Sequence, residues 1–149
     1  MTKEDFEKKK EEEIKVQTEK EAQTIEAYLA EKGLHAQKTP SGIYYIIEKQ
    51  GDGPKAEPGK TVTVNYTGKL MDGKVFDSSL KPGRTPYDVK LGSTPPQVIR
   101  GWEEGLTLFN AGGKGTLIVP SPLGYGTHGS GLIPPNSILI FDIEMIAVK

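Results

Sequence analysis

The residues that could carry out covalent or metal chemistry are few and scattered in this 149-residue chain. His35 and His128 stand in different segments without ligand-spaced neighbours, which argues against a metal site. Ser78 and Ser79 lie in VFDSSL rather than in the GxSxG turn of a serine hydrolase. Because the chain has no cysteine, thiolate catalysis and thiolate metal sites are excluded. The sequence therefore predicts no metal, no cofactor and no covalent nucleophile.

Two other candidate motifs do not fit the chemistry they suggest. Glu103 and Glu104 are neighbours in a predicted helix and point about 100° apart, a poor arrangement for a paired acid and base. We expect them to form a solvated face near the helix start, where negative charge is favourable. The segment GYGTHGSG is rich in glycine but matches neither a P-loop nor a GxGxxG motif, so phosphate binding is not predicted.

Aromatic and branched side chains, by contrast, gather in or beside the predicted loops. Each is ordinary alone, but together they predict an apolar cleft with a few polar tips, a composition typical of small-ligand and peptide pockets. The set is Tyr66, Phe76, Asp77, Tyr87, Val98, Ile99, Trp102, Tyr125, Leu132 and Ile133.

Trp102 is the only tryptophan and lies between Gly101 and Gly105. Apolar residues in the segment 97–109 recur at spacings of one, three and four, which predicts an amphipathic helix. Each glycine costs about 1 kcal/mol against alanine in a helix interior, so the pair indicates close approach of another group to the backbone or to the indole face. Two interpretations stay open: a tryptophan packed in the core, or one whose face lines the cleft.

The elements that must position these side chains are mostly strands. From residue 42 the apolar pattern has a period of two, as in TVTVNYTGKL, where alternate residues are apolar. Asp72 and Gly73 predict a hairpin. The fold class is therefore α+β, with an antiparallel sheet packed on one short helix. The predicted strands lie in 42–50, 61–70, 87–91, 115–120 and 137–148.

The first 33 residues differ in composition from the rest. Residues 1–32 hold 7 lysines and 10 acidic residues, with no glycine or proline, and predict a long charged helix that ends at Gly33. Residues 34–41 are predicted to be a linker, and residues 42–149 one domain. The apolar stripe of the helix is thin, so it is either a solvated helix that docks only its last turns or an arm that dimerises or contacts clients.

Overall charge and hydropathy exclude some partners. The net charge of −1 and the absence of a basic cluster argue against nucleic acid. No run of about 18 apolar residues predicts a membrane span, and the charged start lacks the apolar centre of a signal peptide. We expect a cytoplasmic protein, with the periplasm or cell envelope as the alternative if a signal or lipoprotein segment has been removed.

Four segments are similar to the FKBP-type peptidyl-prolyl cis-trans isomerases, in the order and near the spacing of that family: VNYTGKLMDGKVFDSS, VIRGWEEGL, PLGYGTHG and LIPPNSILIFDIEM. The resemblance runs from about Gly42 to the C-terminus, and the whole chain resembles a bacterial type with an N-terminal helical extension. It implies an FKBP-like half-barrel, a twisted antiparallel sheet wrapped around one short helix. It also implies that Trp102 forms the floor of the active-site pocket, with the prolyl ring on the indole face.

The resemblance further implies site residues and a function. Tyr87 stands where the family usually has phenylalanine, and Leu132 and Ile133 are expected in the loop over the pocket. The implied function is isomerisation of Xaa-Pro bonds in protein folding, without cofactor or metal. The implied catalytic residues are Tyr66, Phe76, Asp77, Trp102, Tyr125 and Phe141, and the implied substrate-binding residues are Tyr87, Val98, Ile99, Leu132 and Ile133.

The implied partners are proline-containing polypeptides and macrolides such as rapamycin. A rival hypothesis is a binding module that grips proline-containing chains with little turnover and uses the N-terminal helix as its interaction surface. A third combines isomerase and chaperone, with the helix as a homodimer arm or a client platform.

Overall fold

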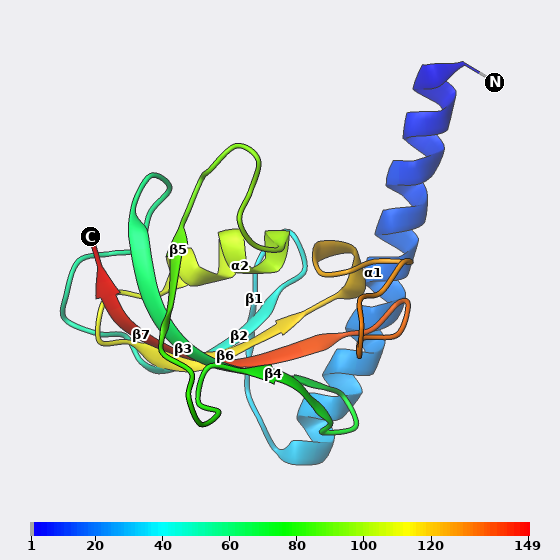
Figure 1. Ribbon diagram of the computed structural model, residues 1–149. Coiled ribbons are helices and arrows are strands. Elements are labelled where there is room, and N and C mark those ends of the chain that lie inside the picture. The colour runs from blue at the N-terminus through cyan, green and yellow to red at the C-terminus, as the bar shows by residue number, and fades with distance from the viewer. Residues whose placement is uncertain (1) are drawn as a thin grey trace.

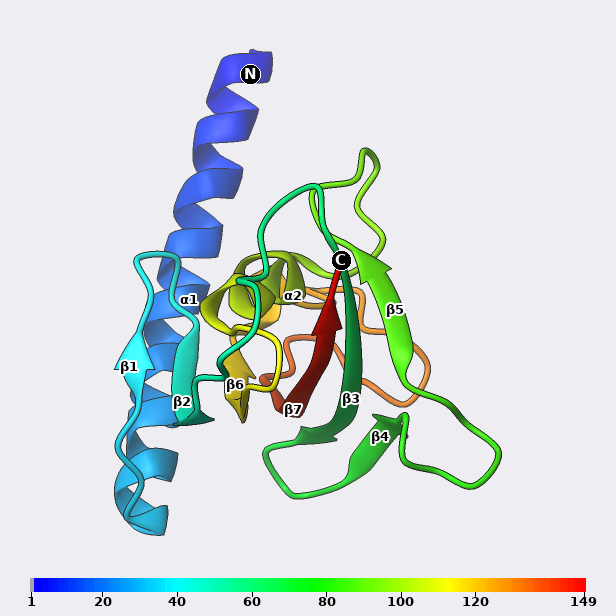
Figure 2. The same ribbon diagram turned by 90° about the vertical axis from the view of Figure 1, so that its left-hand side faces the viewer.

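The computed structural model describes residues 2–149 and contains one seven-stranded antiparallel sheet with helices on both of its faces (Figures 1 and 2). The strand order is β1-β2-β6-β7-β3-β4, and β5 pairs with β3 beside β4. In chain order the elements are α1 Lys3–Lys32, β1 Gln37–Lys38, β2 Tyr44–Lys49, β3 Thr61–Leu70, β4 Val75–Ser78, β5 Tyr87–Lys90, α2 Arg100–Gly105, the 3₁₀-helix η1 Leu106–Leu108, β6 Lys114–Val119, the 3₁₀-helix η2 Ser121–Leu123 and β7 Leu139–Val148. The predicted α+β half-barrel is confirmed.

At the end of the sheet formed by β2, β6 and β7, both faces are buried. Leu117 and Phe141 belong to the core under α2, whereas their neighbours Ile118 and Ile140 belong to a second core under α1. Figure 1 shows α2 on one side of the sheet and the lower half of α1 on the other. Strands covered on both faces need apolar residues at every position, which explains the unbroken runs YYII, LIV and ILIF.

Strand β3 is buried on one face only. Val62, Val64 and Tyr66 point into the core, whereas the threonines and Asn65 between them are only partly buried. This alternation confirms the period-two prediction for 61–70. It also places Tyr66 on the side of the sheet where α2 lies.

Helix α2 is shorter than the predicted 97–109. It begins at Arg100, because Ile99 is still extended with φ −60° and ψ 155°, and it continues past Gly105 as the 3₁₀-helix η1. Val98 and Ile99 nonetheless pack against the same core as Trp102. Apolar residues in an extended segment can reach the core at the same spacing as apolar residues in a helix. The spacing alone therefore could not show where the helix begins.

Gly101 and Gly105 allow α2 to lie directly on β6. A Cβ atom at Gly101 would stand 2.5 Å from Cγ1 of Val119, and one at Gly105 would stand 2.6 Å from Cδ1 of Leu117. The predicted close approach is confirmed, and the element that approaches is β6. Trp102 is therefore carried by a helix fixed at two points on the sheet.

Glu103 and Glu104 do not form the expected solvated face, and that prediction was wrong. Both are partly buried because loops cross the polar side of the short helix α2. Oε2 of Glu103 accepts a hydrogen bond of 2.9 Å from the Gly92 N–H, and Glu104 accepts one from the Ser41 hydroxyl. The two carboxylates therefore hold loops against α2.

Helix α1 ends at Gly33 as predicted, and a hydrogen-bonded cap begins it. Thr2 and Asp5 form a capping box, and Gly33 ends the helix in the left-handed region with φ 68°. Only its second half is docked, through Ala22, Ile25 and Leu29, as expected for a solvated helix that packs its last turns. None of the helices in residues 2–149 has the length and apolar character of a membrane span.

The segment 34–41, predicted as a linker, contributes an edge strand. Gln37 and Lys38 form β1, which pairs with Tyr45 and Tyr44 of β2. Two residues are too few to give a period-two pattern, so the sequence carried no signal for this strand.

Candidate active site

A cavity of about 150 Å³ opens beside α2 on the concave side of the sheet. Its walls come from β3, β4, β5, β7, the start of α2 and the loop after η2, segments that are distant in sequence. The lining residues are Tyr66, Phe76, Asp77, Tyr87, Gln97, Val98, Ile99, Trp102, Tyr125 and Phe141.

Trp102 is fixed by the aromatic rings around it. The ring centroids of Tyr66 and Phe141 lie 4.9 Å and 5.3 Å from that of the indole, each at an interplanar angle of 81°. Tyr87 completes the group at 6.4 Å. Edge-to-face pairs of this kind contribute about 0.5–1.5 kcal/mol each beyond their buried area. The indole therefore combines both interpretations made from the sequence, because it is packed in the core and also lines the cavity.

Phe76 forms a wall of the cavity because β3 has a glycine where it passes. A Cβ atom at Gly68 would lie 2.6 Å from Cζ of Phe76 and 2.9 Å from Cε1 of Phe141. The two phenyl rings meet edge to face at 5.7 Å in the space that this glycine leaves. An inward-facing position of β3 thus accommodates side chains of its two neighbouring strands.

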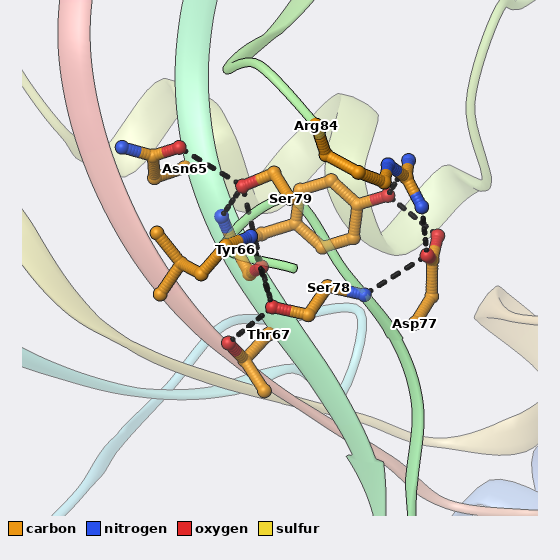
Figure 3. Close-up of polar contacts among 8 residues, drawn as sticks. Asn65, Tyr66, Thr67, Asp77, Ser78, Ser79 and Arg84 are labelled. Atoms are coloured by element: carbon orange, nitrogen blue, oxygen red, sulfur yellow. Dashed lines mark hydrogen bonds and ion pairs between the residues drawn. The ribbon is translucent and has the colours of Figure 1, made fainter. Parts of the chain in front are cut away.

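Asp77 is the only carboxylate that residues 2–149 contribute to the cavity lining, and three donors hold it (Figure 3). The Tyr66 hydroxyl donates to Oδ2 at 2.5 Å, and the Arg84 guanidinium and the Ser78 N–H donate to Oδ1 at 2.8 Å and 2.9 Å. The guanidinium also donates to the Tyr66 hydroxyl at 3.5 Å. Tyr66, Asp77 and Arg84 therefore form a closed triangle at the rim.

Ser78 and Ser79 fix the strand pair that carries this triangle. The buried Ser79 hydroxyl accepts from the Tyr66 N–H at 2.9 Å and donates to Oδ1 of Asn65 (Figure 3). The Ser78 hydroxyl is within 3.0 Å of that of Thr67. These serines, unsuited to nucleophilic catalysis by their sequence context, keep β4 in register with β3.

Burial and hydrogen bonding set the protonation states around the cavity. Burial, and then the hydrogen bond to Asp77, raise the pKa of Tyr66 to about 12. Burial alone would raise the pKa of Asp77, but the hydrogen bonds from Tyr66 and Arg84 outweigh it and lower that pKa. Burial also raises the pKa of Tyr125. Near neutral pH the two tyrosines are protonated donors and Asp77 is an anion, so none of the three is set to exchange protons.

Residues 53–146, more than half of the chain, match the sequence pattern of the FKBP-type peptidyl-prolyl cis-trans isomerases. The chain belongs to this family. Among individual FKBP-type relatives, the "Probable FKBP-type peptidyl-prolyl cis-trans isomerase" of Haemophilus influenzae is 46% identical over 143 residues, covering 95% of this chain and 57% of that protein. The "FK506-binding protein" of Neisseria meningitidis is 48% identical over 106 residues, which are 69% of this chain and 94% of that one.

The fold is similar to that of solved FKBP-type proteins. The crystal structure of FkpA from Escherichia coli superposes with a TM-score of 0.73 at 36% identity and covers 98% of this chain and 69% of that one. The chain spans about half the length of several curated relatives that it matches, 57% for the Haemophilus protein and 45% for FkpA of Aeromonas hydrophila.

The structure brings together nine of the eleven site residues that the FKBP resemblance implied. The two others, Leu132 and Ile133, are absent from the lining: Leu132 is exposed, and Ile133 is buried in the core under α2. Two residues near the cavity were not predicted. Gln97 lines it, and its side-chain oxygen accepts from the Lys90 N–H, while Arg84 completes the triangle with Asp77.

Arg84 is expected to control the acid titration of Asp77. Because the folded-state pKa of Asp77 is depressed, its contribution to stability is present above the ordinary aspartate pKa of about 3.9 and is lost as the pH falls through the folded-state value. Replacing Arg84 with alanine removes a donor and a positive charge, so the folded-state pKa of Asp77 rises toward the ordinary value. The contribution of Asp77 to stability is then smaller, and its loss on acidification is complete at a higher pH. The measurement is a ¹³C NMR titration of the Asp77 carboxyl group, with Lys81→Ala as the control in the same loop. An Asp77 pKa that is the same in Arg84→Ala and the wild type would contradict the prediction.

Proposed function

We propose that this chain catalyses cis-trans isomerisation of Xaa-Pro bonds in polypeptides. The observation that carries the proposal is the small aromatic cavity over Trp102. Its ten lining residues, which lie between Tyr66 and Phe141 in the sequence, include hydroxyl donors. They include no serine or cysteine nucleophile and no group whose pKa suits proton exchange at neutral pH. Rotation about an Xaa-Pro bond requires no bond to be broken and no proton to move. The site therefore suits this reaction better than any hydrolysis or group transfer.

The mechanism follows from the properties of the amide. Rotation faces a barrier of ~18–20 kcal/mol because resonance gives the C–N bond partial double-bond character. The twisted transition state loses that resonance and its charge separation, so a dry cavity favours it over the planar amide. Each 1.36 kcal/mol of this preference is a factor of about ten in rate.

Each part of the cavity has a role in this account. Trp102 forms the floor, and Phe76 and Phe141 enclose the proline ring and exclude water. The partly exposed Tyr125 provides a hydroxyl that can donate to a backbone carbonyl of the twisted substrate. Asp77 acts by orienting Tyr66 and Arg84 rather than as a base.

The test is protease-coupled turnover of a short Xaa-Pro peptide, with and without rapamycin. We expect turnover above the uncatalysed rate. We also expect rapamycin to inhibit it, because the peptide and the drug would occupy the same cavity over Trp102. No turnover together with drug binding would instead support the rival function, a module that binds proline-containing chains. Absence of both would contradict the proposal for this cavity.

The exposed half of α1 is proposed as a contact surface, either for a second copy or for clients. This proposal is supported by the exposed apolar side chains of Phe6, Ile14 and Val16, which lie in the first half of α1, where the helix does not pack on the sheet. Light scattering of the full chain and of a Phe6→Ser, Val16→Ser variant should show a dimer for the first and a monomer for the second. Equal masses would leave the client platform as the role of this surface.

A further inference from the structure

Glu21 is the one acidic side chain of α1 that is buried, with 4% of its surface exposed. A buried carboxylate is costly unless hydrogen bonds satisfy it. Ser121 of η2 provides two of them: its N–H donates to Oε1 at 2.6 Å, and its hydroxyl donates to Oε2. Gln17, one turn earlier in α1, donates to the same Oε2. Both oxygens of the carboxylate are thus used, and two of the three donors belong to one residue a hundred positions away.

Ser121 in turn holds the backbone on both sides of Tyr125. Its carbonyl oxygen accepts from the Gly124 N–H at 3.0 Å and from the Gly126 N–H at 2.9 Å. Gly126 adopts φ 58°, and glycines of this kind leave the chain free to take many conformations. Tyr125 therefore lies between two glycines, and the Ser121 carbonyl oxygen is the hydrogen-bond acceptor for both of their N–H groups.

The arrangement of elements makes this connection direct. Helix α1 packs against η2, and Figure 1 shows the loop after β6 lying against the middle of α1. The same loop leads to Tyr125, whose side chain lines the aromatic cavity. A chain of hydrogen bonds therefore runs from the N-terminal helix through Ser121 to the backbone beside the cavity.

We propose that Glu21 is a positioning residue for Tyr125, so that α1 supports the catalytic site as well as covering the back of the sheet. Glu21 fixes Ser121, and Ser121 fixes Gly124 and Gly126, which sets the direction of the Tyr125 hydroxyl. The catalytic consequence rests on the proposed isomerase function. The effect on the Tyr125 loop does not.

A double-mutant cycle tests the catalytic consequence in the full chain. Glu21→Ala is expected to lower kcat/KM for an Xaa-Pro peptide about fivefold, the effect of one weakened hydrogen bond, and to do so mainly through kcat. In the Tyr125→Phe background the same change is expected to have no effect, because the hydroxyl that Glu21 positions is gone. Glu21→Gln, which keeps an acceptor for the Ser121 N–H, is expected to restore most of the activity. Glu19→Ala is the matched control, an exposed acid on the same helix.

Equal losses in the wild-type and Tyr125→Phe backgrounds, or no loss in either, would overturn the catalytic consequence. If Glu21→Ala does not fold, Glu21→Met fills a similar volume and cannot accept from Ser121, so it takes its place in the cycle.

Amide hydrogen exchange provides a readout that is independent of activity. Exchange of the Gly124 and Gly126 amides should accelerate in Glu21→Ala and stay at the wild-type rate in Glu19→Ala. If the wild type shows no turnover but this acceleration occurs, the isomerase function fails and the positioning of the loop by Glu21 stands. Unchanged exchange at both glycines would overturn the positioning itself.

Discussion

Phe76→Ala should lower kcat/KM for an Xaa-Pro peptide by about 30-fold while leaving the fold intact. Shielding one phenylalanine side chain from water is worth about 2 kcal/mol, and loss of that amount in the transition state corresponds to ~30-fold in rate. Phe76 is only partly buried, and its principal ring partner is Phe141, so the sheet itself does not depend on it. Removing the ring opens the wall beside Gly68 and admits water to the cavity.

The comparison that isolates this effect is Val75→Ala on the same strand. Val75 is 44% exposed and lies outside the cavity, so its truncation should leave turnover unchanged. Turnover of the two variants and the wild type would be measured beside thermal unfolding, so that lost activity is separated from lost structure. A Phe76→Ala protein as active as Val75→Ala would mean that this wall does not contact the prolyl ring.

Gly115→Ala should cost about 3 kcal/mol of unfolding free energy, at the upper end of what overpacking a core usually costs. A Cβ atom at this position of β6 would stand 2.2 Å from the carbonyl oxygen of Ile46 and 2.9 Å from the ring of Phe109. The oxygen belongs to the neighbouring strand β2 and cannot turn away like a side chain, and Phe109 is fully buried. Relief therefore requires β2 and β6 to separate. Urea unfolding measures the loss as a lower midpoint.

Gly101→Ala provides a graded comparison in the same region. Its added Cβ meets the Val119 side chain rather than backbone, and alanine gains about 1 kcal/mol over glycine in a helix interior, so the net loss should be smaller. Equal unfolding midpoints for Gly115→Ala and the wild type would show that β2 gives way at no cost, contrary to this account.

Much of the fold could be predicted because its signals are local. The alternation in β3 follows from one covered face, and the paired glycines of α2 indicated the close approach that β6 makes. The linker strand β1 and the true start of α2 left no such signal, because two residues have no period and extended apolar residues can have the spacing of a helix.

The candidate site also contains residues that the sequence could identify and residues that it could not. Aromatic residues stand out by type, so most of the cavity could be gathered from sequence. Arg84 and Gln97 act through bonds that depend on the paths of two loops, to Asp77 and to the Lys90 N–H. Glu21 is one of ten acidic residues in the first 32, and nothing in its neighbours along the chain distinguishes it as the buried one.

The place of β7 in the sheet has a consequence for how the molecule is made. β7 is the last strand in residues 2–149, yet it lies between β6 and β3, and its pairing with β3 joins residues such as Tyr66 and Ile143. On a ribosome, β1, β2 and β6 on one side and β3, β4 and β5 on the other have no strand between them until β7 emerges. Contacts so distant in sequence also slow folding, because a long loop must close before they form. The nascent chain therefore carries its unpaired strand edges until synthesis of this domain is complete, the stage at which a chaperone would be needed most.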